Sequence, residues 1–450
     1  MAPRKSVTGS MADKPKTTWG DGGLFGNRAV GSLMLMLVTP MFVFFIWYTC
    51  AVHDGSVAGV VAEAIKVGPL AFVQSLWPTP FDPYAWKMIL SYMAFELFLM
   101  KFVPGKAFHG SATPTGHVPV YNANGVQCYV ITIATLFGLA YYGVIRPAEV
   151  YDNFGKLLSS MNLFAIFFCL MLTVKGLNFP STKDNGSNGN WIIDFFWGTE
   201  LYPRILGWDV KQFTNCRFGM MFWQVGIICY AFKQYEDLGG HISSSMLVSV
   251  LLQTVYIAKF FWWETGYFCS MDIQHDRAGY YICWGCMMWV PSVYTIHTFF
   301  LVKHPIYLSI PTTLLLLAAG VFCIWCNYDC DRQRQEFRAK NGQVQVWGED
   351  PVYIEARCKV DGKDRTSLLL ASGWWGLARH FHYVPEIMSS VFWCVPVQAS
   401  FPLPYFYPVY LTLLLLDRAW RDDARCGDKY KEDWKAYCKL VPYKIVPGIV

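Results

Sequence analysis

The chain contains 450 residues, of which 54% are hydrophobic, 17% aromatic and only 15% charged, and its formal net charge is +5. A water-soluble domain normally carries about 25% charged residues, so this composition excludes an ordinary soluble protein and indicates a membrane protein. The small net charge gives no reason to expect a nucleic-acid partner.

The N-terminal segment 1–28 is polar and precedes the first apolar run. Its basic residues include Arg4, Lys5, Lys14 and Lys16. A cleaved signal peptide would place a short apolar stretch close to its basic residues, whereas here the apolar run begins only after this segment. We therefore expect residues 1–28 to be a disordered tail.

Long apolar runs recur along the rest of the chain. The strongest cover 29–52, 126–145, 157–174, 242–258, 278–302 and 306–328. Weaker candidates cover 88–100, 218–232, 366–378 and the proline-broken stretch 387–416. Runs of about 20 apolar residues are long enough to cross a bilayer as helices, and they lack the alternation of barrel strands. The predicted fold class is all-α: a polytopic membrane protein with about 8–10 transmembrane helices.

Residues 29–450 are expected to form a single membrane domain, because no repeat, low-complexity array or linker interrupts them. The cations are unevenly spread, since eight Lys or Arg lie in 329–365 and eight more in 417–446. Basic residues beside membrane spans favour the cytoplasmic side. Both segments are therefore predicted to face the cytosol.

A metal site and a disulfide framework are not expected. Most of the 15 cysteines fall in apolar runs and are interpreted as buried thiols. Cys283 and Cys286 have the spacing of a zinc or redox pair, but there is no second pair. Only His380 and His382 are close neighbours among the nine histidines, which is too few for the iron sites of membrane desaturases.

The stretch 260–285 contains five ionisable groups among nine aromatic side chains. They are Glu264, Asp272, His275, Asp276 and Arg277. Each charge within a span costs about 2.5–3.5 kcal/mol on insertion scales, so such a cluster indicates a functional pocket or a salt-bridged interior. In the second case Glu264 and Asp272 pair with Lys259 and Arg277. Glu96, alone in an apolar run, poses the same question.

Two polar segments then follow the last strong span. In 328–338, Arg334 and Arg338 are four residues apart and share one helix face. In 368–386, paired tryptophans between glycines precede Arg379, His380, His382 and Tyr383. A solvated face attracted to anionic lipid would explain the first segment, and an interfacial aromatic belt the second.

A third polar segment, 415–450, has a helical stripe. Its members are Arg418, Arg421, Asp422 and Arg425. Three separate segments with arginines and aromatics on one predicted face favour an anionic cofactor. NADPH suits that charge, because it carries a pyrophosphate and an extra ribose phosphate.

Several long motifs in fixed order resemble the sterol reductase family. They are GTELYPRILGWDVKQFTNCRFGM, WWETGY with MDIQHDRAGYYICWG, DCDRQRQEFR, GWWGLARHFHY, RDDARC with DKY, and VPYKIVPGI. The likeness runs from about residue 24 to the C-terminus, and the wording favours the delta-7 branch. It implies about ten transmembrane helices in the endoplasmic reticulum, with a sterol pocket at roughly 200–300 and a cytosol-facing NADPH pocket within 328–450.

The resemblance also implies a set of cofactor contacts, to which the polar segment 368–386 adds its arginine, Arg379. The set is Arg334, Arg338, Leu370, Trp375, Arg379, His382, Tyr383, Asp422, Cys426, Gly427, Asp428, Lys429, Tyr430 and Tyr437. Arg334 stands where relatives often have lysine, and His382 where animal relatives have asparagine. Both replacements still donate hydrogen bonds, so the sites are retained.

The chemistry expected of such a site begins with a proton. A ring alkene accepts hydride only after an acid protonates it, and protonation at carbon 8 of a 5,7-diene leaves a cation at carbon 7 that the 5,6 double bond delocalises. Glu264 or Asp272 is the preferred acid, with Tyr256 or a tyrosine of 280–281 relaying or supplying the proton. The aromatic residues of 260–289 would line the sterol pocket and exclude water.

Three alternatives stay open from the sequence. A delta-14 sterol reductase would share most of the motifs. A membrane methyltransferase that uses S-adenosylmethionine has a similar C-terminal arrangement. A sterol-binding scaffold without catalysis is the third alternative, although the N-terminal tail is too short for an added binding module.

Overall fold

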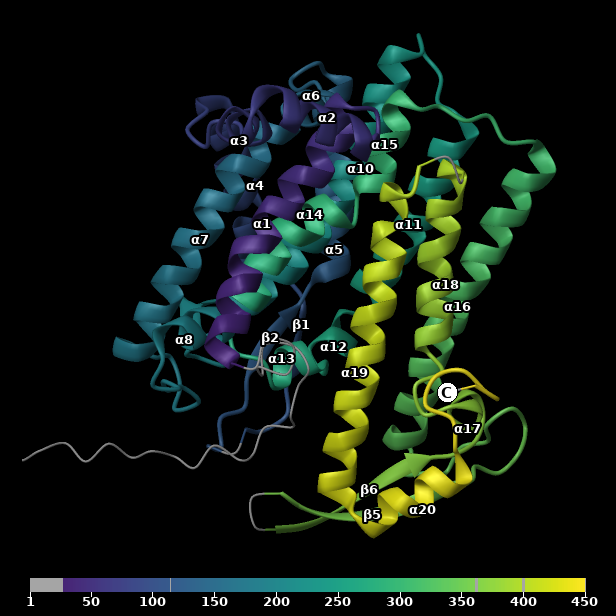
Figure 1. Cartoon of the computed structure of the whole chain (residues 1–450). Helices are drawn as coiled ribbons and strands as arrows, with labels where there is room; N and C mark the ends of the chain where they lie inside the picture. Colours follow the sequence, from purple (N-terminus) through teal and green to yellow (C-terminus); the bar gives the residue numbers. More distant parts are fainter. Residues whose placement is uncertain (1–26, 114, 361–362, 399–400, 450) are drawn as a thin grey trace, which may run out of the picture. The chain divides into compact units, whose positions relative to one another are not determined.

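The computed structural model of the chain describes residues 27–113, 115–360, 363–398 and 401–449 (Figure 1). The predicted disordered tail lies almost wholly outside the described residues. The described chain is mostly helical and divides into two compact units. The large unit comprises Ser32–Arg332 and His382–Thr412, and the small unit lies mainly in Gln333–Phe381 and Leu413–Val450.

The large unit is built mostly from helices. They are α1 (Arg28–Val52), α2 (Val57–Val67), α3 (Pro69–Leu76), α4 (Pro83–Phe102), α5 (Gly125–Tyr141), α6 (Glu149–Asp152), α7 (Phe154–Asn178), α8 (Trp191–Trp197), α9 (Val210–Gln212), η1 (Phe213–Gly219), α10 (Met220–Asp237), α11 (Ser244–Trp262), α12 (Glu264–Tyr267), α13 (Met271–Gln274), η2 (Tyr280–Trp289), α14 (Val290–Val293), α15 (Ile296–Lys303), α18 (Tyr383–Cys394), η3 (Val395–Val397) and η4 (Leu403–Tyr405). Two small antiparallel hairpins join them: β1 (Lys106–His109) with β2 (Val120–Ala123), and β3 (Arg204–Ile205) with β4 (Trp208–Asp209).

Two long helices contribute to both units, α16 (Ile310–Ala339) and α19 (Phe406–Tyr430). The small unit adds a hairpin of β5 (Tyr353–Val360) and β6 (Lys363–Leu370), then α17 (Trp374–Leu377) and α20 (Glu432–Leu440). Its core forms where α20 packs on the hairpin, with Trp434 and Tyr437 against Ala356 and Leu369.

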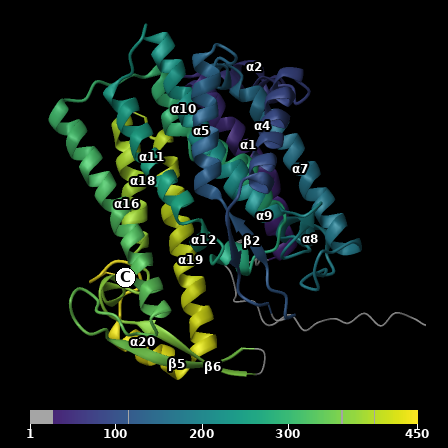
Figure 2. The same ribbon diagram turned by 180° about the vertical axis from the view of Figure 1, so that it is seen from behind.

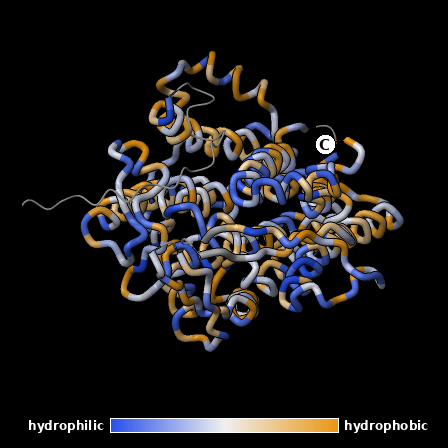
Figure 3. The backbone as a smooth tube through the Cα atoms, turned by 90° about the horizontal axis from the view of Figure 1, so that it is seen from below, coloured by the Kyte–Doolittle hydropathy of each residue, from blue (hydrophilic) through white to orange (hydrophobic). Residues whose placement is uncertain are grey.

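The prediction of an all-α polytopic membrane protein is confirmed. Five described helical segments are long and apolar enough to cross a membrane: α1, α7, α11, Tyr280–Lys303 and α16. The shorter apolar segments Gly125–Tyr141 and Tyr383–Val397 join them, and α4, α10 and α19 are 20, 18 and 25 residues long. Hydrophobic residues recur along most of these helices (Figure 3).

One weak span prediction is wrong. Residues 366–378 are not a helix but the second half of β6, a turn and the short α17. The apolar run Leu368–Leu370 is only three residues long, and it pairs with Tyr353–Glu355 in the β5–β6 register. Gly373 then adopts φ +61°, which ends any continuous segment. The stretch 387–416 is divided as its prolines suggested, into α18 and the start of α19.

Several helix starts follow signals that are visible in the sequence. Asp82 accepts a hydrogen bond from the Ala85 backbone N–H and is followed by Pro83 at the first position of α4. Ser243 accepts from the Met246 N–H at the start of α11. Such caps satisfy amide groups that a helix start leaves unbonded. They fix where each span begins, and α4 then packs beside α5 and α7 (Figure 2).

The packing of η2 in the large unit depends on two glycines. Gly198 ends α8 with φ +87°, and Gly279 directly precedes η2. A Cβ atom at Gly279 would lie 2.2 Å from the Gly198 backbone nitrogen. The close approach of these two backbone segments therefore requires hydrogen as the side chain.

Replacing Gly279 with alanine is expected to destabilise the protein by at least about 2 kcal/mol, because the overpacked backbone has to move. Gly285→Ala is the matched control, since the same element leaves open space around that position. The measurement is the thermal unfolding midpoint of the two purified variants in detergent. An unchanged midpoint for Gly279→Ala would contradict the described contact.

Candidate functional site

Glu264, the first residue of α12, is buried against Arg217 of η1. The Arg217 Nη1 atom lies 2.5 Å from Glu264 Oε1, and the Gly125 backbone N–H donates to Oε2 at 2.8 Å. The second guanidinium nitrogen of Arg217 donates to Asn124 Oδ1 at 2.7 Å. Arg217 is fully buried and Glu264 is 2% exposed. The carboxylate therefore has an ion-pair partner that differs from Lys259, the one considered from the sequence.

In this arrangement Glu264 is an acceptor. Each of its two oxygens accepts a hydrogen bond from an N–H group. The contacts tie η1, the start of α5 and the start of α12 to one another. A buried charge that is paired in this way is costly to leave alone, so Glu264 and Arg217 depend on each other.

Asp272 lies on α13, and its main-chain carbonyl oxygen accepts a hydrogen bond from a buried lysine. The buried Lys211 amine donates to the carbonyl oxygens of Asp272, Ile273 and Asp276 at 3.0, 2.6 and 2.8 Å. Burial lowers the pKa of Lys211 to about 8. Arg277 donates to the Gly186 carbonyl at 2.6 Å. Lys211 of α9 and Arg277 thus hold loops together through backbone oxygens.

Tyr256, the third predicted catalytic residue, faces α18. Its hydroxyl donates to Glu386 Oε1 at 2.5 Å, and its ring packs against Trp223 and Trp393. The Lys259 amine lies 4.6 Å from the centre of the Tyr256 ring and donates to Asn327 Oδ1. Sequence reasoning missed Glu386. A signal for it existed, because it is the one acid of an otherwise uncharged helix.

Many of the predicted cofactor residues come together in the small unit. The guanidinium of Arg334 lies 4.2 Å from the centre of the Trp375 ring. The Tyr437 hydroxyl donates to the Leu370 carbonyl at 2.8 Å, and Tyr430 donates to Ser367 Oγ at 3.2 Å. Arginine stacked on tryptophan is a surface suited to a flat, charged ligand.

Asp422 is the acidic centre of this cluster. It accepts hydrogen bonds from Arg425, and His380 Nε2 lies 3.8 Å from its Oδ2 atom. Burial opposes ionisation of Asp422, but the charge and hydrogen bond of Arg425, together with the charge of Arg334, outweigh it and lower its pKa. Burial also lowers the pKa of His380 to about 4 and raises that of Cys426 to about 12. At neutral pH the cluster therefore has an ionised aspartate, a neutral imidazole and a neutral thiol.

Arg338 is exposed and has no hydrogen bond or ion pair with any residue that the structure describes. It lies one helical turn beyond Arg334, close enough for the two positive charges to repel. An anion between them would relieve this repulsion. Two neighbouring positive charges on one helix face suit an anion such as a phosphate group.

Arg379 is used differently from what the sequence predicted. It is buried, and its Nη1 donates to the carbonyls of Val441 and Pro442 at 2.6 and 3.0 Å, with Asp423 Oδ1 3.3 Å from its Nε. The Arg379 backbone N–H also donates to the Tyr443 carbonyl. These contacts anchor the C-terminal segment. They also occupy the Arg379 guanidinium, which leaves it fewer donors for a ligand.

The remaining predicted contacts are spread more widely. His382 and Tyr383 belong to the large unit, where the Asn327 side chain donates to the His382 carbonyl at 3.0 Å. Asp428 and Lys429 are exposed on α19 beyond the half-buried Gly427, and the Lys429 amine lies 4.9 Å over the Tyr430 ring. Their roles as cofactor contacts stay predictions.

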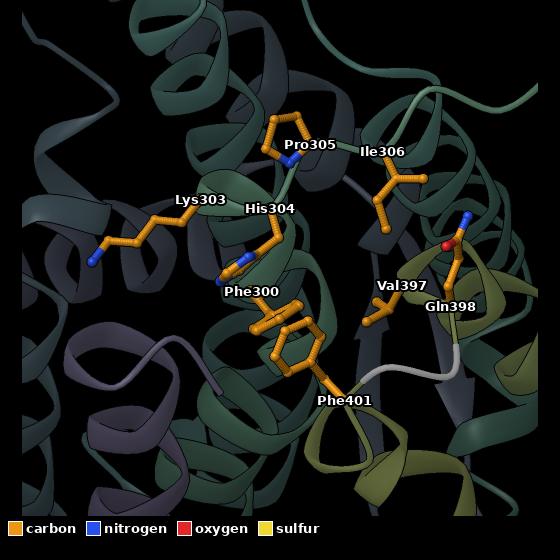
Figure 4. Close-up of a pocket in the computed structure, with 8 residues that line it drawn as sticks. All are labelled: Phe300, Lys303, His304, Pro305, Ile306, Val397, Gln398 and Phe401. Carbon is orange, nitrogen blue, oxygen red and sulfur yellow. The ribbon is translucent and has the colours of Figure 1, made fainter. Parts of the chain in front are cut away.

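A cavity of about 420 Å³ opens elsewhere in the large unit. Phe300, His304 and Phe401 line it (Figure 4). It lies beside Ile306, whose carbonyl accepts from Ser245 at the start of α11, so Tyr256 is 11 residues further along that helix. At 1.5 Å per residue this is about 17 Å away. The cavity is therefore separate from the Tyr256 cluster.

Comparison with known proteins decides the family. Residues 24–450 match the model of the Ergosterol biosynthesis ERG4/ERG24 family. The chain belongs to this sterol reductase family. It is 52% identical to 7-dehydrocholesterol reductase of Arabidopsis thaliana over 93% of the chain and 96% of the relative. It is 33% identical to 7-dehydrocholesterol reductase of Xenopus laevis over the full length of both, and 34% identical to Delta(14)-sterol reductase of Methylotuvimicrobium alcaliphilum over 93% of the chain and 94% of the relative.

The family prediction made from the motifs is confirmed, and so is the membrane architecture that it implied. The motif-bearing segments occupy defined places in this sterol reductase. The stretch GTELYPRILGWDVKQFTNCRFGM supplies Arg217, and WWETGY supplies its partner Glu264. Two motifs that are separate in the sequence thus meet in one buried ion pair.

Removing one partner of that ion pair is expected to lower the stability of the fold, whatever its effect on turnover. Glu264→Gln should lower the free energy of unfolding by about 3 kcal/mol, because the Arg217 charge is left buried and unpaired. Glu236→Gln is the control, since Glu236 forms an exposed pair with Arg146 that contributes at most about 1 kcal/mol. Thermal unfolding in detergent measures both. A Glu264→Gln variant as stable as the wild type but without turnover would instead restore Glu264 as the acid.

Proposed function

We propose that this sterol reductase uses NADPH to reduce the 7,8 double bond of delta-5,7 sterols. The observation that carries the proposal is the 52% identity to a 7-dehydrocholesterol reductase over 93% of the chain. The delta-14 reductase relative, at 34% identity, keeps 14,15-double-bond reduction as the second candidate. Family membership favours both over a methyltransferase or a scaffold.

The small unit supports a phosphate-bearing cofactor. Arg334 and Arg338 present two cations on one helix face, and Arg338 lacks a protein partner among the described residues. Trp375 offers a flat surface, and the ionised Asp422 can accept hydrogen bonds from ribose hydroxyls. NADPH, when bound, supplies the hydride. We propose the extra ribose phosphate or the pyrophosphate as the partner of Arg338.

In the large unit, the Tyr256 hydroxyl is the proposed proton donor, in preference to Glu264. A sterol is a rigid apolar slab, and Trp223 and Trp393 surround the phenol with apolar surface. Protonation of carbon 8 leaves a cation at carbon 7 that the 5,6 double bond delocalises. The surrounding aromatic faces stabilise that cation and exclude water, which would otherwise trap it as an alcohol.

The chain is a multi-pass membrane protein, and we propose the endoplasmic reticulum as its location with the small unit in the cytosol. Two basic segments, 329–365 and 417–446, support this orientation, because Lys and Arg accumulate on the cytoplasmic side of membrane proteins. NADPH is a cytosolic reductant, so this side also suits the proposed cofactor.

The proposed function is tested by expression in yeast, whose main sterol carries the 5,7-diene. Mass spectrometry of sterol extracts should show loss of the diene and a gain of two mass units, and microsomes should repeat this only with NADPH. An unchanged 5,7-diene with reduction of an 8,14-diene would establish the second candidate. Inertness toward both substrates, with folded protein present, would overturn the proposal.

Arg338→Gln is expected to raise the KM for NADPH by about tenfold or more, since a charged hydrogen bond to phosphate contributes about 1.5–3 kcal/mol. Turnover at saturating NADPH should change much less. Arg357→Gln, an exposed arginine of β5 in the same unit, is the control. If both variants keep the wild-type KM for NADPH, the cofactor does not bind at this cluster.

A further inference from the structure

Glu386 is half-buried in the large unit, and its surroundings differ from those of the buried carboxylate Glu264. It is the one acid of α18, and no described lysine or arginine forms an ion pair with it. Its Oε1 atom lies 2.5 Å from the Tyr256 hydroxyl. Glu264, by contrast, is held by Arg217. A carboxyl group without a cationic partner can carry and release a proton.

The Tyr256–Glu386 contact is enclosed by aromatic rings. The Tyr256 ring centre lies 5.2 Å from that of Trp393 and 5.6 Å from that of Trp223, and both tryptophans are at most 1% exposed. The other ionisable groups that face the contact are Lys259 on α11, Tyr294 directly after α14, and Tyr407 on α19. Few charges compete for the proton in this interior.

We propose that Glu386 is the proton source for Tyr256 in the reduction. This inference rests on the proposed function. The relay starts from protonated Glu386, whose carboxyl donates to the Tyr256 oxygen, the reverse of the hydrogen bond in the structure. The carboxyl proton moves to that oxygen while the phenolic proton moves to carbon 8 of the sterol, where the π electron pair forms the new C–H bond. The hydride and its electron pair then form the second C–H bond at carbon 7. Glu386 is left as a carboxylate, and it recovers a proton from water before the next turnover.

The relay avoids leaving a negative charge on the Tyr256 oxygen. A phenol that gives up its proton in an apolar site becomes a buried phenolate, which is costly without a partner. With Glu386 as the source, the phenol is neutral before and after the step and the negative charge resides on a carboxylate. The Lys259 amine lies 4.6 Å from the centre of the Tyr256 ring, on the phenol rather than in an ion pair with Glu386.

The test compares the steady-state kinetics of Glu386→Gln, Glu386→Asp, Tyr256→Phe and the double variant Tyr256→Phe/Glu386→Gln. A general acid contributes about 10²–10⁴-fold, so kcat of Glu386→Gln should fall by about 10²-fold with little change in the KM for sterol or NADPH. The double variant should be no slower than Tyr256→Phe, because the two residues act as one unit. Glu386→Asp should recover part of the rate.

The pH profile separates a proton source from a structural contact. Wild-type kcat should decline with rising pH, because the relay consumes a proton, whereas Glu386→Gln should lose this dependence. Glu63→Gln is the matched control, because Glu63 also accepts from a tyrosine, Tyr48, at 3.0 Å in a partly exposed site away from Tyr256. It should keep the wild-type rate and profile.

Two outcomes would overturn the proton relay from Glu386 to Tyr256. A wild-type pH profile in Glu386→Gln, or losses that add to those of Tyr256→Phe, would overturn the relay. If Glu386→Gln does not fold, Glu386→Asp and a solvent deuterium isotope effect on wild-type kcat replace it. In that case unchanged values in both would overturn it equally. A wild-type enzyme that fails to reduce the 5,7-diene at all refutes the proposed function instead.

Discussion

A charge inside a membrane protein is stable only with a partner, and this constraint organises the large unit. The fully buried Arg217 binds Glu264 and Asn124, while Gly125 at the start of α5 binds the same carboxylate. Three separate segments are thereby fixed around one guanidinium. Removing one member leaves the other charge unpaired in a low-dielectric interior, at a cost of about 3–5 kcal/mol. This cost explains why so hydrophobic a chain retains both charges.

The same constraint assigns different roles to carboxylates that look alike in the sequence. Glu264 and Glu386 both lie in apolar, aromatic surroundings, and each has a short contact of 2.5 Å. The partner of Glu264 is a permanent cation, which fixes it as an acceptor. The partner of Glu386 is a phenol, which can pass a proton in either direction. Separating a structural carboxylate from a proton-transferring one therefore depends on the neighbour more than on burial.

The sequence could predict the spans and the family, because twenty-residue apolar runs and long motifs are local signals. It could not predict the partner of Glu264, since Arg217 is 47 residues away and the pairing arises only when η1 meets α12. It also misjudged 366–378, where three leucines in a row look like part of a span but pair across β5 and β6. Glu386 had a local signal, yet its importance depends on Tyr256, which lies 130 residues earlier.

The small unit shows how a polar ligand site can be built from the same residue types without burying free charge. Arg379 is satisfied by the carbonyls of Val441 and Pro442, and this fixes the C-terminal segment. Arg425 is satisfied by Asp422. Arg338 differs, because it is exposed, faces a like charge and meets no described partner. Arg379 and Arg425 are thus paired within the protein, whereas Arg334 and Arg338 repel each other. Binding of an anion would reduce the repulsion between these two positive charges. The phosphates of a nucleotide would thus complete the electrostatics of this unit, as Glu264 completes those of Arg217.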